Sequence, residues 1–440
     1  MKAVIVNAFE RNNRGDAALL DVMISQVRQA FPQAEIVICG FEDPAAHPEV
    51  WGTRNLGSIR RYSADESIGR VRRMLRKSLV AAVALALAAG LGRRPAAALC
   101  RVLPRELAGE LSAIASADLV VSLGGGYLHG GAGLDYDLSI GFLLLPLWIA
   151  ERFGVPVVLG PQSFGPFPTR FQRLGVRRVL ARAFAVSTRE DISRAMLVEC
   201  GVPERVLRRD VDSAFAFAPA CERDWRAELE VPAGAELIVV TMRSYLEPAA
   251  QEAYEREMAS GIERVLGADE RRFVVLAPQV TCEFQDDDDR LVHRRVAQRI
   301  GRPRLVMIDD ASVSHRDVYA LYGCADLTVA TRFHSAIFSL GQCVPCVVLN
   351  YANKGLGIMR ELGFEQWVAD MSSVTADWLV ERVDRALADG DYRLGLQKAI
   401  PGYRAEVARF VEVLRSAVPA AAAPDASSAA PSDSPAKSDA

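Results

Sequence analysis

The chain lacks most of the features that would assign it directly to a functional class. Its 440 residues include only five lysines and five histidines, and its formal net charge is −3. No basic stripe with interleaved aromatic residues is present, so nucleic acid is not expected as a partner. The glycine fingerprint of dinucleotide-binding folds and the Walker A phosphate loop are also absent. Any anionic ligand would therefore be held by a few local arginines rather than by the field of the whole protein.

Paired cysteines and a secretion signal are missing as well. The eight cysteines are scattered, and the one Cys-x-x-Cys pair, Cys343 and Cys346, has no second pair to complete a zinc site. The opening residues "MKAVIVNAF" are typical of a strand rather than of a signal peptide. We therefore expect reduced thiols, no metal and a cytoplasmic setting.

Residues 71–94 form the one stretch that suggests contact with a membrane. Their uninterrupted apolar run, 79–92, is shorter than the roughly 20 residues that a membrane-spanning helix needs. Basic residues on both sides are typical of a helix that lies on a membrane surface, here the cytoplasmic face of the inner membrane. An Ala/Leu-rich helix packed on its own lobe would explain the same pattern.

Apolar runs of strand length alternate with amphipathic helical segments through most of the chain. The series starts with "KAVIVNAF" and begins again with "ELIVVTMRS", after a stretch that has two prolines and no strand periodicity. This alternation predicts an α/β fold of two doubly wound, Rossmann-like lobes, residues 1–220 and 235–416, with a cleft between them. The Ala/Pro/Ser/Asp-rich residues 417–440 are expected to form a disordered tail.

Nearly every unusual polar cluster follows a predicted strand. In doubly wound sheets, ligands bind beyond the carboxyl ends of the strands, where helix N-termini present free amides. The clusters of the first lobe are "NNRGDA", "GGGYLHGG", "GPQSFGPFP" and "STRED", and those of the second include "TRFH" and "NYANKG". The glycines of "GGGYLHGG" would let the backbone approach a ligand closely, although a purely architectural turn has the same composition.

Several cations are candidates for the cleft. Arg332 and His334 open a helix whose following residues are apolar, so both are expected to project toward the cleft, where the histidine could act as an acid or base. Lys354 adds a cation on the next loop, and Arg189 is either another ligand or a surface ion-pair residue. The acidic run 286–289 is explained by the helix macrodipole, and a metal site is the weaker interpretation.

The motifs "NRGDAAL", "SLGGGYLH", "GPQSFGPF", "STREDIS", "DVDSAF", "TRFHSAIF" and "NYANKGLGIM", in this order, resemble the polysaccharide pyruvyl transferase family over roughly residues 1–385. The resemblance implies a fold similar to the two-lobed GT-B glycosyltransferases. It also implies that phosphoenolpyruvate (PEP), a co-substrate, places pyruvate as a ketal on two hydroxyls of a sugar in a cell-surface glycan or its lipid-linked precursor. The Arg-x-His motif of the family, associated with the PEP site, and its Asn-x-Gly-Asp turn map onto Arg332 and His334, and onto Asn13, Gly15 and Asp16.

The implied reaction assigns a role to each lobe. PEP carries a phosphate and a carboxylate, which arginine binds well, so we expect the second lobe to be the PEP side and the first the acceptor side. The expected PEP-binding residues are Arg189, Arg243, Arg332, His334 and Lys354. The expected acceptor-binding residues are Asn13, Asp16, Gly125, Gly126, His129 and Gln162.

The expected catalytic residues are His334, Arg332 and Asp16. The histidine would donate a proton, the arginine would stabilise developing charge, and Asp16 would be the counterpart of the histidine. Asp16 could instead, or in addition, cap the first helix. The scheme needs no cofactor and no metal.

Two other functions fit the same fold, because fold does not determine function. A nucleotide-sugar-dependent GT-B glycosyltransferase of polysaccharide biosynthesis would often have a carboxylate late in its second lobe, where this chain has "NYANKGLG". A non-catalytic scaffold for glycan assembly would not need the Arg332–His334 pair.

Overall fold

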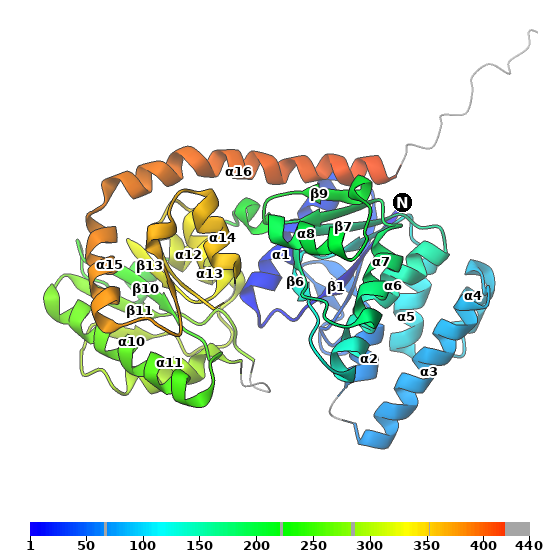
Figure 1. The fold of residues 1–440 in the computed structure, drawn as a ribbon, viewed down its shortest axis with the longest axis horizontal. Coiled ribbons are helices and arrows are strands. Elements are labelled where there is room, and N and C mark those ends of the chain that lie inside the picture. Colours follow the sequence, from blue (N-terminus) through cyan, green and yellow to red (C-terminus); the bar gives the residue numbers. More distant parts are fainter. Residues whose placement is uncertain (66–67, 221–222, 283–286, 352, 419–440) are drawn as a thin grey trace, which may run out of the picture.

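The computed structural model describes residues 1–440 except 66–67, 221–222, 283–286, 352 and 419–440, and describes residues 353 and 354 by their backbone only. Figure 1 shows two lobes side by side, joined along one edge by a long C-terminal helix. Each lobe contains its own mainly parallel sheet. The predicted fold class, two doubly wound lobes, is confirmed. The expected tail, residues 417–440, lies outside the described residues from 419 onward.

The first sheet has the strand order β3-β4-β2-β1-β5-β7-β8-β9, and β6 pairs with β7. All of these pairs are parallel except β3 with β4. The central strands are continuous buried apolar runs, as expected where helices cover both faces of a sheet. The strands are β1 (Lys2–Ala8), β2 (Glu35–Gly40), β3 (Glu49–Val50), β4 (Thr53–Asn55), β5 (Leu119–Ser122), β6 (Gly125–Leu128), β7 (Val157–Phe164), β8 (Ala185–Thr188) and β9 (Leu207–Arg209).

Three helices of the first lobe begin at residues whose side chains cap them. Asn13, Ser58 and Thr169 each accept a hydrogen bond from a backbone amide of the first turn that follows. The helices are α1 (Arg14–Ala30), α2 (Ile59–Ala64), α3 (Arg70–Ala88), α4 (Arg93–Leu99), α5 (Arg105–Ala115), α6 (Leu134–Arg152), α7 (Arg170–Leu180) and α8 (Asp191–Glu199), with the 3-10 turns η1 (Glu204–Val206) and η2 (Ser213–Ala216).

The segment 71–94 forms two helices rather than one. Gly90 follows the end of α3 with a φ of +107°, a conformation that residues with a Cβ rarely adopt. Within the described ranges, no helix is both long enough and apolar enough to cross a membrane.

The second sheet has the order β12-β11-β10-β13-β14-β15, with every pair parallel. Numbered within the lobe, this is the 3-2-1-4-5-6 order whose reversal point favours a ligand site beyond the first and fourth strands. The strands are β10 (Glu236–Thr241), β11 (Arg272–Leu276), β12 (Leu305–Met307), β13 (Leu327–Ala330), β14 (Cys346–Asn350) and β15 (Val368–Asp370).

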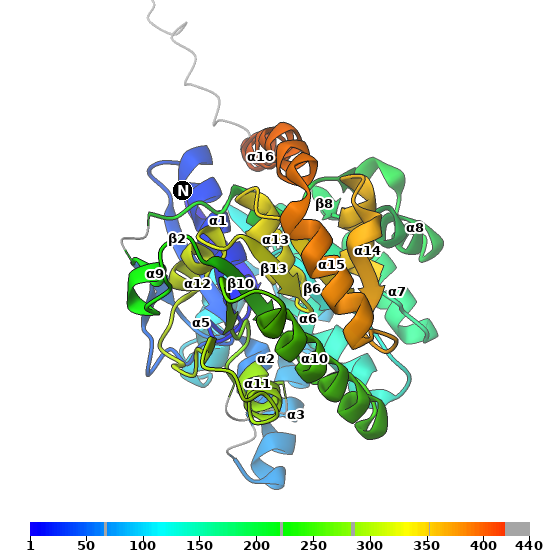
Figure 2. The same ribbon diagram turned by 90° about the vertical axis from the view of Figure 1, so that its left-hand side faces the viewer.

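The helices of the second lobe lie on both faces of its sheet. Figure 2, in which this lobe faces the viewer, shows α10 and α15 packed together, while α12 and α13 lie toward α1 of the first lobe. The helical elements are α9 (Trp225–Glu228), α10 (Pro248–Ala268), α11 (Asp289–Ala297), α12 (His315–Gly323), α13 (Phe333–Gly341), α14 (Asn353–Glu361), η3 (Glu365–Trp367), α15 (Ala376–Ala388) and α16 (Gly390–Ala417).

The last helix, α16, belongs to both lobes. It leaves the second lobe and packs on α1 and η2. Gln26 of α1 donates a hydrogen bond to the carbonyl of Val407 at 3.2 Å, and Arg415 donates to the carbonyl of Gln29 at 2.9 Å. Residues 235–416 therefore include a helix that fastens the second lobe to the first.

The polar loop after β1 is docked on the second lobe. Arg14 is buried, and its guanidinium donates to the carbonyls of Val313 at 2.9 Å and Pro278 at 3.3 Å. Its own amide donates to the carbonyl of Gln279 at 3.0 Å, and Asn13 forms an antiparallel bridge with Val280. This contact explains why a buried strand opens into such a polar turn.

Candidate active site

The candidate site lies where α13 of the second lobe meets α1 of the first. A Cβ added to Gly15 would overlap the imidazole ring of His334, so only glycine lets the two helices approach this closely. The ring is largely buried at this contact, with 12% of the side chain exposed. The structure therefore brings together two of the motifs that carried the resemblance, the Asn-x-Gly-Asp turn and the Arg-x-His pair.

Asn13 and Asp16 organise the first turn of α1. The Asn13 side chain accepts hydrogen bonds from the amides of Gly15 at 3.1 Å and Asp16 at 3.4 Å, and its own amide donates to the Asp16 carboxylate at 2.8 Å. Asn13 is therefore the N-cap, which corrects the interpretation that Asp16 caps this helix. Asp16 also lies beside Gly125, because a Cβ on that glycine would be 3.7 Å from its Oδ1.

Arg189 and Asp212 form a buried ion pair that reaches His334. Arg189 follows β8, and its Nη1 donates to Asp212 Oδ2 at 2.6 Å, with 3% of each side chain exposed. The same Asp212 oxygen lies 3.9 Å from Nε2 of His334. The guanidinium of Arg189 also stacks on Phe333, 4.5 Å from the ring centre. Arg189 is thus an internal ion-pair residue at the junction of the lobes, rather than a surface one.

The carboxylates around Arg189 stabilise its protonated form. Burial alone would lower its pKa, but the negative charges of Asp212 and Glu190 outweigh burial, and the pKa is raised above its usual value. Ser163 accepts a further hydrogen bond from Arg189 Nε at 2.8 Å. Sequence reasoning gave Asp212 no role, although it belongs to the "DVDSAF" motif, which follows the short strand β9.

Arg332 directly precedes α13, and two carboxylates neutralise its charge. Its Nη2 donates to Asp289 at 2.6 Å and to Asp287 at 2.8 Å. Burial alone would lower the pKa of Arg332, but Asp289 and Asp287 together raise it. Asp289 is fully buried and also accepts the amides of Gln279 and Val280, each at 2.9 Å.

The acidic run is therefore more than a set of helix N-terminal charges. Asp288 does cap α11, as the macrodipole interpretation predicted, and it accepts the amide of Arg290 at 2.9 Å. Asp287 and Asp289, however, are the counter-charges of Arg332, which corrects an explanation by the macrodipole alone. Asp286 lies outside the described residues.

Arg243, which follows β10, shares Asp287 with Arg332. Its Nη2 donates to Asp287 at 2.8 Å, and its guanidinium lies 4.5 Å from the ring centre of Tyr351. Asp287 therefore pairs with both arginines, and its side chain is 39% exposed. The side chain of Lys354 lies outside the described residues.

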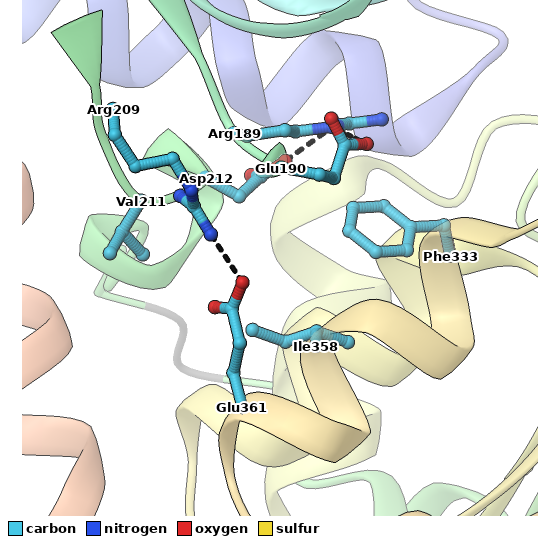
Figure 3. Close-up of a pocket in the computed structure, with 8 residues that line it drawn as sticks. All are labelled: Arg189, Glu190, Arg209, Val211, Asp212, Phe333, Ile358 and Glu361. Carbon is cyan, nitrogen blue, oxygen red and sulfur yellow. Dashed lines mark hydrogen bonds and ion pairs between the residues drawn. The ribbon is translucent and has the colours of Figure 1, made fainter. Parts of the chain in front are cut away.

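Two small hollows flank Phe333 at this junction. One is lined by both lobes, with Arg189, Asp212 and Arg209 on one side and Ile358 and Glu361 on the other (Figure 3). Arg209 and Glu361 form an ion pair across it. The other hollow is lined by Arg332 and by residues at the ends of β13 and β14.

The remaining expected acceptor residues lie at the end of β7 and in its neighbour β6. Gln162 stands opposite Gly125 in the strand register and is fully buried, and its side-chain amide has no hydrogen-bond partner among the described residues. The carbonyl of Gly126 accepts a hydrogen bond from Nδ1 of His129 at 3.0 Å. His129 itself is exposed. The structure thus gathers Asn13, Asp16 and Gly125, whereas the contact it shows for His129 is local.

Comparison with known proteins gives a family and a fold. A model of the family described as polysaccharide pyruvyl transferase matches residues 13–353. The amylovoran biosynthesis protein AmsJ of Erwinia amylovora is 28% identical over 291 residues, which cover 61% of this chain and 65% of that protein. The chain therefore matches a little less than two thirds of the length of this relative.

Solved structures that resemble the chain include a UDP-GlcNAc 2-epimerase and a trehalose 6-phosphate synthase. The UDP-GlcNAc 2-epimerase of Methanocaldococcus jannaschii has a TM-score of 0.55 at 13% identity, covering 94% of this chain and 100% of that one. The trehalose 6-phosphate synthase of Burkholderia multivorans has a TM-score of 0.54 at 14% identity, covering 94% and 98%. At such low identity these similarities establish the GT-B-like fold alone.

Proposed function

The chain belongs to the polysaccharide pyruvyl transferase family, and from this premise we propose that it transfers pyruvate from PEP to a sugar as a ketal. The acceptor would be a cell-surface polysaccharide or its lipid-linked precursor, and the reaction would take place in the cytoplasm. The observation that carries the proposal is the close contact of His334 with Gly15. This contact supports a single site made by the Arg-x-His pair of one lobe and the Asn-x-Gly-Asp turn of the other.

PEP would bind to the cations of the second lobe. Its phosphate and carboxylate both suit the planar, two-pronged guanidinium of arginine. Arg332 and Arg243 are held together by Asp287, which is partly exposed and can turn away, whereas the buried Asp289 keeps Arg332 in place. In this scheme an oxygen of PEP replaces Asp287 between the two arginines.

The chemistry requires one proton donor and one proton acceptor. His334 would protonate the methylene carbon of PEP while a sugar hydroxyl attacks the adjacent carbon, and Asp16 would accept the proton of that hydroxyl. The C–O bond to phosphate would then break, and a second hydroxyl of the sugar would attack the same carbon to close the ketal ring. The proton lost by this second hydroxyl balances the one that the departing phosphate takes up. Asp212, 3.9 Å from His334, would hold the orientation of the imidazole. Arg189 fixes Asp212 in turn.

The proposal is tested by incubating the protein with PEP and isolated acceptor glycans. We expect phosphate release, and a mass increase on the sugar that corresponds to one pyruvate ketal. The rival glycosyltransferase function is tested alongside, by comparing the melting temperature with PEP and with UDP-sugars. Stabilisation by a UDP-sugar, with transfer of its sugar and no pyruvate on the acceptor, would replace the proposal.

A further inference from the structure

The first lobe carries a long helix that the proposed reaction does not use. Only Val80, Val83 and Leu87 are buried among the 19 residues of α3, and they share one face of the helix. In the N-terminal half of α3, Arg76 donates to the carbonyl of Tyr62 at 3.2 Å and to Asp65 at 3.1 Å. α3 therefore presents most of its surface outward.

The outward face of α3 is apolar. Val71, Met74, Leu75 and Leu85 expose 72, 62, 65 and 70% of their surfaces. Ala82 and the small polar residue Ser78 lie between them. From Val71 to the neighbours Met74 and Leu75, and on through Ser78 and Ala82 to Leu85, each step is three or four residues, so these residues form one stripe opposite the buried face. Single exposed apolar residues are ordinary on protein surfaces, but a continuous apolar stripe marks a surface that binds something.

The charge around this stripe is strongly one-sided. Residues 69–105 contain nine basic and no acidic residues, in a chain whose net charge is −3, so the rest of the chain carries −12. Arg70 and Lys77 flank the stripe on one side of the helix, and Arg72 flanks it on the other. An apolar stripe bordered by cations is the arrangement of helices that lie in the interface of an anionic membrane.

We propose that α3 docks the enzyme on an anionic lipid bilayer. The apolar stripe enters the interface, and Arg70, Arg72 and Lys77 meet lipid phosphates. A second copy of the chain is a poorer occupant, since two surfaces with the same excess of positive charge repel each other. In Figure 1, α3 and α4 lie at the end of the first lobe that is remote from the second, so a flat bilayer can reach them.

This docking is independent of the reaction and is tested on the full-length protein without substrate. The measurement is co-sedimentation with vesicles of phosphatidylcholine and phosphatidylglycerol in equal amounts, and with phosphatidylcholine alone. We expect binding to the mixed vesicles only, weakened by added salt. In the variant R70Q/R72Q/K77Q, binding should fall by about a hundredfold, because each cation near an anionic surface contributes roughly fivefold.

A second variant tests the apolar contribution. V71S/L75S/L85S should lose vesicle binding while keeping its melting temperature, because all three side chains are exposed. The matched controls remove the same kinds of side chain from the second lobe and α16. R256Q/R264Q/R409Q and L291Q/L394Q change exposed residues and should bind vesicles as the wild type does.

Three outcomes would overturn the proposal. Equal binding to both kinds of vesicle would remove the role of charge, and binding unaffected by both α3 variants would remove the role of this helix. A change of oligomeric state in the variants, without a change in vesicle binding, would make the stripe an interface between copies. Turnover of a soluble acceptor should be unaltered in all four variants, which separates docking from the proposed reaction.

Discussion

Without β3, β6 and β9, the first sheet has the same strand order as the second, β4-β2-β1-β5-β7-β8 against β12-β11-β10-β13-β14-β15. The two lobes differ in the connection between the third and fourth of these shared strands along the chain. In the second lobe this connection, from β12 to β13, contains the helix α12, which packs against α1. In the first lobe, the corresponding connection from β4 to β5 contains α2, α3, α4 and α5 among its described residues. The compact connection helps to build the junction of the lobes, whereas the expanded one carries the exposed basic helix on the far side.

The lobes also contribute different chemistry to the junction. The first lobe supplies the glycine and the capped polar turn of α1, together with the Arg189–Asp212 pair. The second supplies Arg332 and His334 at the start of α13, together with the carboxylates that neutralise Arg332. Neither lobe holds all of these groups, so the proposed reaction depends on the contact between them. The substitutions described below test whether both lobes contribute to the reaction.

The largest expected effect is the loss of turnover when His334 of the second lobe is replaced. His334→Ala should lower turnover by about a hundred- to ten-thousandfold, the usual contribution of a general acid or base. PEP binding should weaken only modestly, because a proton donor acts mainly in the transition state. Pyruvate transfer measured by mass spectrometry, with PEP affinity measured by calorimetry, separates the two. If turnover stays near normal, the proton comes from elsewhere, and His129 becomes the next candidate.

The next largest effect is expected from adding a methyl group to Gly15 of the first lobe, which should lower turnover by displacing His334. Gly15→Ala places a Cβ where the His334 ring now lies, so the ring must move or the lobes must separate. We expect a loss of turnover of at least about tenfold, since small misplacements at a reacting centre can cost a hundredfold. Gly141→Ala is the matched control.

Gly141 lies in the middle of α6, and a Cβ there would meet nothing within 4 Å. Because alanine favours helices by about 1 kcal/mol over glycine, this control should keep full activity and gain stability. A Gly15→Ala enzyme as active as Gly141→Ala would mean that the contact between the lobes does not position His334.

The sequence predicted the fold and the family, but not which charged residues pair at the site. The period of apolar residues and the turn chemistry predicted both lobes, and motif order identified the family. The partners of the charged residues were not predictable, because Arg332 pairs with carboxylates 43 and 45 positions away. Sequence rules for helices describe neighbours three or four residues apart, so the same carboxylates were interpreted as helix N-terminal charges.

Arg14 shows the same limit in the first lobe. Its motif was interpreted as the acceptor side of a cleft, and the turn does carry Asn13 and Asp16 beside Gly125. Yet Arg14 itself is buried against the carbonyl of Val313, 299 positions away. A polar loop in the sequence can face a ligand or another lobe, and local patterns do not distinguish the two.

A smaller effect is expected from the cations of the second lobe. Arg332→Lys should weaken PEP binding by about 2 kcal/mol, because lysine cannot reproduce the two-pronged contact. Asp287→Asn should act in the opposite direction and tighten PEP binding, since it removes the charge that PEP has to replace. Calorimetric titration with PEP measures both. Weaker PEP binding in Asp287→Asn would show that the carboxylate orients the arginines instead of competing with the ligand.

The smallest expected effect concerns stability, and it has opposite signs in the two lobes. Burial raises the pKa of Glu110, in the first lobe, to about 8, while its carboxyl group accepts the amide of Ile59 at 2.6 Å. Burial lowers the pKa of His293, in the second lobe, to about 4, and its Nε2 accepts the amide of Met242 at 3.0 Å. Both groups are therefore neutral near pH 7 in the folded protein.

The sign of each pH dependence follows from which state binds the proton more tightly. The folded state holds the Glu110 proton more tightly than the unfolded state, so the stability it contributes is lost as the pH rises toward 8. The unfolded state holds the His293 proton more tightly, so that stability is lost as the pH falls from 6.5 toward 4. Each slope should be at most about 1.4 kcal/mol per pH unit. In the wild type the two slopes oppose each other between pH 4.5 and 6.5, which leaves an acid limb below this range and an alkaline limb above it. Glu110→Gln should flatten the alkaline limb and extend the rise of the denaturant midpoint up to pH 6.5. His293→Gln should flatten the acid limb and extend the fall of the midpoint down to pH 4.5. If either variant shifts the whole curve without changing a limb, the removed group is not titrating in the folded protein, and the lobes do not differ in this way.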